Sequence, residues 1–297
     1  MAVRDVFQTT TAGLSADTLP MRLYEKAKRL GTWDPSVLDL TRDCAGWAAL
    51  DEDERDGILQ ITALFLAGEE AVTVDLLPLV MTIAREGRLE EELFLTTFLF
   101  EEGKHMQFFR RFLDEVAGSP TGLERFVTPS YRALFADELP RAMQRLLVDP
   151  SPAAQARTAV TYNMIVEGVL AETGYHVYHE ALAKRGLLPG LREGLGNVKR
   201  DESRHIAYGV YLLSRLVAAE PELWETVEER MNELLPLALA FVAESFEPYP
   251  DAVTPFGITL DSVVEWATGN FQKRFARIER ARRQTLAELE AELAEAD

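Results

Sequence analysis

The chain has 297 residues, of which 47% are hydrophobic and 27% are charged, and this globular composition is enough for one large core or two modest domains. Its formal net charge of −18 argues against a nucleic-acid surface, which needs basic patches, and against docking on an anionic membrane. Cys44 is the single cysteine, so no intramolecular disulfide can form, and the N-terminus MAVRDVFQTT shows no apolar signal segment. We therefore expect a cytoplasmic protein.

Helical periodicity dominates the chain, and no stretch alternates as a half-buried strand would. We expect helices over residues 51–85, 88–117, 128–147, 151–184, 191–219 and 221–247, and a last one from Leu260. Pro78 and Pro140 should bend the first and the third, because proline lacks an amide donor. Residues 58–84 are the most apolar stretch, but charged residues interrupt them, so they predict a buried helix and no stable membrane insertion. Helices of this length favour an all-α, up-and-down bundle.

The tail over residues 274–297 is dense in charged residues and alanine. This composition predicts a solvated helix that frays at its end. No internal repeat of short period and no low-complexity linker interrupts the sequence, so one domain over residues 1–297 is the simplest organisation.

Two segments carry a glutamate and a histidine three residues apart. The first, FEEGKHMQFF, holds Glu102 and His105, and the second, DESRH, holds Glu202 and His205. Residues at this spacing share one face of a helix, so each pair can bind one iron, manganese or zinc ion. One such pair arises readily by chance in a glutamate-rich chain, and a buried hydrogen bond is its structural alternative. Glu101 competes with Glu102 but lacks the histidine spacing.

Two further glutamates lie on apolar helical stripes. Glu69 precedes the first Glu-x-x-His segment, and Glu167 precedes the second. Each half of the chain thus offers one glutamate on one helix and a Glu-x-x-His on the next, which is the ligand pattern of di-metal carboxylate bundles. Periodicity alone leaves Glu70 open as an alternative to Glu69, and Glu172 as a weaker alternative to Glu167.

These segments resemble a known family. GEEAV at 68–72, Glu102-x-x-His105, Tyr162-x4-Glu167 and Asp201-Glu202-x-x-His205 look like the ligand-binding oxidases related to the ribonucleotide reductase small subunit. The resemblance covers about residues 51–217, which would form the metal-binding core. It implies a ferritin-like four-helix bundle with additional helices. It also implies a centre of one manganese and one iron ion, with two irons as the alternative, bound by Glu69, Glu102, His105, Glu167, Glu202 and His205.

The same resemblance implies an activity. Members activate dioxygen, form an ether crosslink between a valine and a tyrosine, here Val72 and Tyr162, and bind a long-chain fatty acid in an apolar channel. A homodimer is expected on the same ground. Tyr162 precedes Glu167 by five residues, about 140° around an ideal α-helix. The crosslink therefore requires a local distortion such as a π-bulge, or a ring that leans across the helix.

Asp201 directly precedes a ligand glutamate. We expect it to hydrogen-bond a ligand histidine and fix its tautomer, although an exposed helical acid is the simpler alternative.

Two other functions remain open at this point. A ribonucleotide reductase small subunit would carry its radical tyrosine four residues after the first ligand histidine, where this chain has Phe109, and it would carry an aromatic residue near its C-terminus, where residues 288–297 have none. A metal-storage protein, or a lipid-binding module with a structural metal, is the second alternative.

Overall fold

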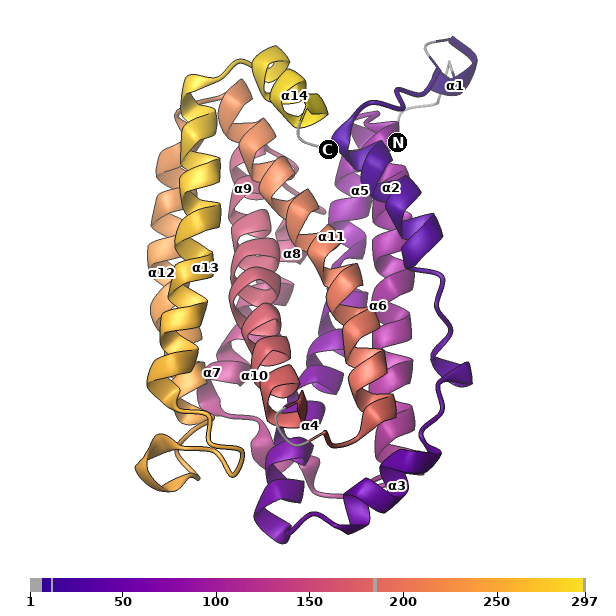
Figure 1. Ribbon diagram of the computed structural model, residues 1–297. Helices are drawn as coiled ribbons and strands as arrows, with labels where there is room; N and C mark the ends of the chain where they lie inside the picture. The colour runs from indigo at the N-terminus through magenta and orange to yellow at the C-terminus, as the bar shows by residue number, and fades with distance from the viewer. Residues whose placement is uncertain (1–6, 12, 184–185, 296–297) are drawn as a thin grey trace.

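The computed structural model describes residues 7–11, 13–183 and 186–295, and the elements in these ranges are helical (Figure 1). The only β-type pairing among them is a single bridge between Val253 and Thr259. The α-helices are α1 (Gln8–Thr11), α2 (Leu19–Leu30), α3 (Thr41–Ala48), α4 (Glu52–Asp75), α5 (Leu77–Arg85), α6 (Leu89–Glu115), α7 (Pro129–Arg132), α8 (Leu139–Arg145), α9 (Pro152–Ala159), α10 (Glu172–Ala183), α11 (Pro189–Ala219), α12 (Leu223–Glu244), α13 (Leu260–Arg280) and α14 (Leu286–Glu295).

Two π-helical segments and four short 3₁₀ turns complete the fold. The π-helices are η3 (Ala133–Glu138) and η4 (Val160–Ala171), and the 3₁₀ turns are η1 (Pro35–Val37), η2 (Leu123–Phe126), η5 (Pro250–Ala252) and η6 (Ala281–Arg283). No helix in the described ranges combines the length and the apolar composition that crossing a membrane requires.

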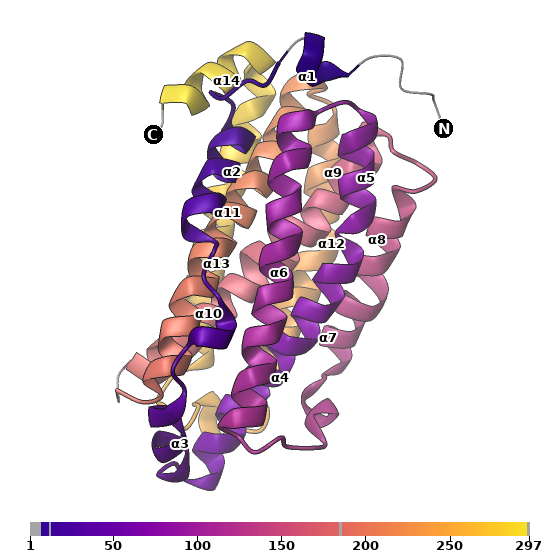
Figure 2. The same cartoon turned by 90° about the vertical axis from the view of Figure 1, so that its right-hand side faces the viewer.

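Four rods form the centre of the bundle: α4, α6, α11, and the continuous rod α9–η4–α10. α4 packs on α6, and η4 packs on α11, while α11 also contacts α6. In Figure 2, α6 stands towards the viewer in the centre of the picture, with α2 on one side and α5 and α8 on the other. α12 and α13 cover the outer face of η4. Many side chains between the four rods are therefore buried.

Local sequence signals explain several helix boundaries. Asp51 and Glu54 form a reciprocal capping box at the start of α4. The expected bend near Pro78 is present, since the predicted helix 51–85 divides into α4 and α5 at Leu76. Pro140 follows the π-helix η3, so the third predicted helix is also interrupted close to its proline. The Ser151 side chain caps α9, and the predicted end of that rod, Lys184, lies outside the described residues.

The prediction for the C-terminal tail was right in part: the described tail is mainly helical with many exposed side chains, but it does not form one continuous helix, and residues 296–297 lie outside the described residues. The helix from Leu260 ends at Arg280, and after η6 the chain turns back as α14. α14 packs on α2 and α11, with Leu289 fully buried and Glu290 accepting a hydrogen bond from Tyr211. Charged residues alternate with apolar ones in α14, so the charge-rich composition of this segment did not indicate that Leu289 would be buried.

The helices before residue 51 were not predicted from the sequence. α2 packs on α6 and α11. α3 brings Asp43 to the start of α11, where its carboxylate accepts hydrogen bonds from the backbone amides of Gly190 (2.9 Å) and Leu191 (2.7 Å). This buried aspartate satisfies amides that have no partner inside their own helix.

Candidate metal centre

The four central rods bring all six predicted ligand residues together. α4 supplies Glu69, α6 supplies Glu102 and His105, η4 supplies Glu167, and α11 supplies Glu202 and His205; each is buried. Their ligand atoms form two groups of four, each within 4.8 Å of one another. The first group is Glu69, Glu102, His105 and Glu202, and the second is Glu102, Glu167, Glu202 and His205.

The two groups share Glu102 and Glu202. One oxygen of Glu202 lies 3.2 Å from Nδ1 of His105, and its other oxygen lies 3.3 Å from Nδ1 of His205. Glu102 is divided in the same way, at 3.5 Å and 3.1 Å from the same two nitrogens. Glu69 lies only on the His105 side and Glu167 only on the His205 side. This is the geometry of two metal positions bridged by two carboxylates.

The unpaired atoms of the site test whether these residues suit metal ions. Within the described residues, both oxygens of Glu102, one oxygen each of Glu167 and Glu202, and Nδ1 of both histidines are buried without a hydrogen-bond partner. Leaving so many polar atoms unpaired in a dry interior is costly. Four carboxylates with two neutral imidazoles carry a formal charge of −4, which two divalent cations would balance. The residues therefore fit a pair of transition-metal ions.

Burial is the strongest influence on each ionisable group of the site. It raises the pKa of Glu69 well above its usual value, with repulsion from Glu102 added, and that of Glu167 likewise, with repulsion from Glu202. For the shared Glu102 and Glu202, the nearby histidines outweigh burial and the pKa is lowered. Burial would lower the pKa of both histidines, but the surrounding carboxylates raise it well above the ordinary range. The metal-free site therefore holds protons that an arriving cation must displace.

A second layer of charges holds the histidines. Nε2 of His105 donates to Asp201 at 3.2 Å, and Nε2 of His205 donates to Glu101 at 2.9 Å. Each acid comes from the helix opposite its histidine, so α6 and α11 support one another across the site. These bonds fix the tautomer that leaves Nδ1 free to face the metal positions. The geometry around Asp201 is the one expected from sequence, although its role stays a prediction.

Sequence reasoning missed most of this layer. Asp201 also accepts from Trp33 Nε1 (2.7 Å) and Lys104 Nζ (3.0 Å), and Arg204 bridges Asp201 and Glu101. One signal was present in the sequence: both segments read acid-Glu-x-x-His, as Glu101-Glu102 and as Asp201-Glu202. The repeated first acid marks the partner of the opposite histidine.

The alternatives left open by periodicity separate in space. Glu70 is exposed while Glu69 is buried, because consecutive residues on α4 point about 100° apart. Glu172 pairs with Arg274 of α13 instead of facing the site. A further residue that sequence reasoning passed over is Tyr175, whose hydroxyl donates to Glu69 at 2.8 Å.

Tyr162 and Glu167 both lie on the π-helix η4. A π-helix links residue i to residue i+5, so residues five apart come to nearly the same face, which removes the angular conflict of an ideal α-helix. Tyr162 is fully buried, and no described residue accepts from its hydroxyl. Burial, reinforced by Glu102 and Glu167, raises its pKa well above the usual value, so the phenol remains protonated.

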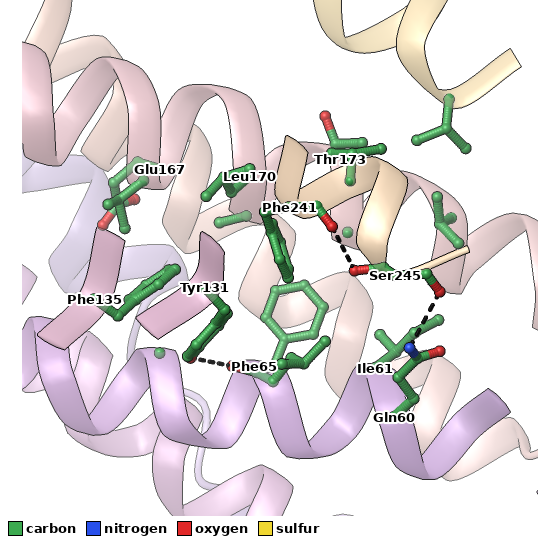
Figure 3. Close-up of a pocket in the computed structure, with 18 of the residues that line it drawn as sticks. Gln60, Ile61, Phe65, Tyr131, Phe135, Glu167, Leu170, Thr173, Phe241 and Ser245 are labelled. Atoms are coloured by element: carbon green, nitrogen blue, oxygen red, sulfur yellow. Dashed lines mark hydrogen bonds between the residues drawn. The ribbon is translucent and has the colours of Figure 1, made fainter. Parts of the chain in front are cut away.

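A long apolar pocket opens from the metal positions. Figure 3 shows Glu167 at one end, Gln60 and Ser245 at the other, and the aromatic side chains of Phe65, Tyr131, Phe135 and Phe241 between them. Four candidate ligands and Val72 line its metal end. The pocket is thus an apolar channel that ends on carboxylates suited to bind cations.

Comparisons with known proteins agree with this geometry. The family model for the ribonucleotide reductase small chain matches residues 21–274. Among similar solved structures is an R2-like ligand-binding oxidase, a tyrosine-to-phenylalanine mutant with an aerobically reconstituted Mn/Fe cofactor, at 39% identity over 94% of this chain and 100% of that chain, with a TM-score of 0.87. A glycine-to-leucine mutant with an anaerobically reconstituted Mn/Fe cofactor matches at 38% identity over the same shares, with a TM-score of 0.88. The predicted all-α, ferritin-like fold is confirmed.

Proposed function

Because the chain belongs to the ribonucleotide reductase small-chain family and, within it, to the R2-like ligand-binding oxidases, we propose that it is an oxidoreductase with a manganese–iron centre. The six residues that would hold the two ions are Glu69, Glu102, His105, Glu167, Glu202 and His205. The observation that carries this assignment is that the ligand atoms of all six residues converge on two adjoining positions, with buried and unpartnered atoms on every one of them except Glu69.

When bound, the metal pair supplies redox chemistry towards dioxygen. The chain's own residues prepare the site for it. Glu102 and Glu202 hold the two positions together, and Asp201 and Glu101 keep each imidazole in the tautomer that can bind. The six side chains that would hold the metals are buried between the four packed rods, which limits the access of water to the site.

We further propose that dioxygen drives an ether crosslink between Cβ of Val72 and the hydroxyl oxygen of Tyr162. A C–H bond and an O–H bond break, a C–O bond forms, and two electrons and two protons pass to dioxygen. Val72 follows Glu69 by three residues and lines the same pocket, and Tyr162 lies on the π-helix beside Glu167. The high pKa of the phenol keeps the hydrogen that this reaction removes.

Peptide mass spectrometry tests the crosslink. Protein loaded with metal in air should yield one joined peptide containing Val72 and Tyr162, lighter than the two separate peptides by two hydrogens. Tyr162→Phe is the matched control, since it keeps the ring but lacks the oxygen. Separate, unmodified peptides from fully loaded, air-exposed protein would contradict the crosslink.

The pocket supports a long-chain fatty acid as the ligand. Its walls are aromatic and aliphatic, and its inner end faces the metal positions, where a carboxylate head group would find cations. Retention of such a lipid through purification, detected after denaturing extraction, is the direct test. The homodimer and the cytoplasmic location belong to this proposal as well; light scattering on the purified protein tests the dimer.

The residues around the metal positions do not support the alternative of a ribonucleotide reductase small subunit. Phe109 occupies the position four residues after His105 and is fully buried against Phe65 and Phe108. It offers no hydroxyl that could be oxidised.

A further inference from the structure

Two hydrogen bonds link residues that line the apolar pocket at the end far from the metal positions. Tyr249 donates to Oε1 of Gln60 at 2.6 Å, and Nε2 of Gln60 donates to the carbonyl of Ser245 at 3.1 Å. All three residues line the pocket. We call these three residues the polar cap; Figure 3 shows Gln60 and Ser245 joined across the far end. The cap places hydrogen-bonded polar groups in a wall that is mostly apolar.

The cap joins a helix to a loop. Gln60 lies on α4 and is almost fully buried, whereas Tyr249 belongs to the connection between α12 and α13 and is half-buried. This connection lies directly on α4, since a side chain at Gly57 would meet the Tyr249 hydroxyl at 3.5 Å. Asp251 and Ala252 within it have positive φ angles of 55° and 52°, which non-glycine residues adopt at a cost. The outer half of the cap is therefore the part that can move with least loss of packing.

Helix geometry gives the length of the enclosed channel. Gln60 precedes the candidate ligand Glu69 by nine residues, which is about 13.5 Å along α4. An extended chain of single bonds advances about 3.6 Å for every three bonds, so this distance corresponds to about eleven bonds. A saturated acid of about twelve carbons fits between the metal positions and the cap. A chain of about sixteen carbons is too long and must pass it.

We propose that the polar cap is both the gate of the pocket and its chain-length determinant. Acids of up to about twelve carbons are enclosed behind the closed cap, and longer acids bind only when Tyr249 separates from Gln60 and their tails emerge there. This inference rests on the proposed fatty-acid ligand, and adds the residues that select among fatty acids. Losing one hydrogen bond of ordinary net strength changes an equilibrium by about tenfold.

Competition between fatty acids of different length tests the gate. The full-length, metal-loaded protein is incubated with an equimolar mixture of saturated acids from about ten to about eighteen carbons, freed of unbound lipid, and extracted for mass spectrometry. The variants are Tyr249→Phe, which removes only the hydroxyl, and Gln60→Ala. Tyr211→Phe is the matched control, because it also removes a tyrosine hydroxyl that donates to a side chain, Glu290, outside the pocket.

We expect Tyr249→Phe and Gln60→Ala to raise the ratio of long to medium acids by about tenfold over the wild type, and the control to leave it unchanged. If Gln60→Ala does not fold, Tyr249→Phe decides alone. Bound acids with the same length distribution in wild type and variants would overturn the gate but leave the proposed ligand standing. Failure of the wild type to retain any acid would overturn both.

Discussion

Replacing Glu101 by glutamine should weaken metal binding at one of the two metal positions and not at the other. Among the two histidines, Glu101 accepts only from His205 and Asp201 only from His105, so the substitution removes the negative charge behind one histidine and leaves the direct partner of the other in place. Glutamine has the size of glutamate but only one acceptor oxygen, which can accept from Nε2 of His205 or from Arg204, while the other donor faces the amide NH2 group. Because the side-chain volume is nearly unchanged, the bundle should still fold.

The expected magnitude follows from the role of such outer partners. Their loss weakens metal binding by about 10- to 100-fold, or about 1.4–2.8 kcal/mol. Titration of metal-free protein followed by elemental analysis should show the position nearer His205 losing affinity by this factor while the position nearer His105 is retained. Asp201→Asn is the matched variant with the opposite preference. Equal loss at both positions in each variant, or no loss in either, would refute the reasoning.

Two further predictions address protons and stability. The pKa of His105 and His205 is raised in the metal-free site, so both imidazoles hold protons at neutral pH that a cation must displace. Metal addition at pH 7 should therefore acidify a weakly buffered solution, and metal affinity should increase by up to about tenfold per pH unit for each proton released. A metal affinity that does not change with pH would contradict this prediction. Asp43→Ala should lower the free energy of unfolding by about 2–4 kcal/mol in denaturant titrations, because two buried amides at the start of α11 lose their acceptor. Asp43→Asn should lower the free energy of unfolding by less. An unchanged denaturation midpoint for Asp43→Ala would contradict this capping role.

The fold was largely predictable because its rods follow apolar periodicity and end at prolines and glycines. α6 and α11 lie close to their predicted ranges. α14 was not predictable in the same way, since its buried face consists of few apolar residues such as Leu289 among many charges. Its packing depends on contacts with α2 and α11, which no local pattern encodes.

The candidate ligands were accessible to sequence reasoning because i, i+3 spacing fixes a shared helical face. Periodicity could not choose between Glu69 and Glu70, since both had apolar neighbours; the family resemblance favoured Glu69, and the rotation of α4 in the bundle buries Glu69 and exposes Glu70. The role of Glu101 depends on a contact between α6 and α11 across the site, so it required coordinates. For Tyr162, the five-residue spacing to Glu167 indicated a π-bulge or a leaning ring, and the structure has a π-helix over Val160–Ala171.

Anomalous diffraction at the manganese and iron absorption edges tests the central claim most directly. Crystals of protein loaded with both metals should show two peaks, one beside Glu69 and His105 and the other beside Glu167 and His205, bridged by Glu102 and Glu202. An anomalous map without a peak between these side chains, or with a single ion at the centre, would contradict the assignment of a two-metal oxidase.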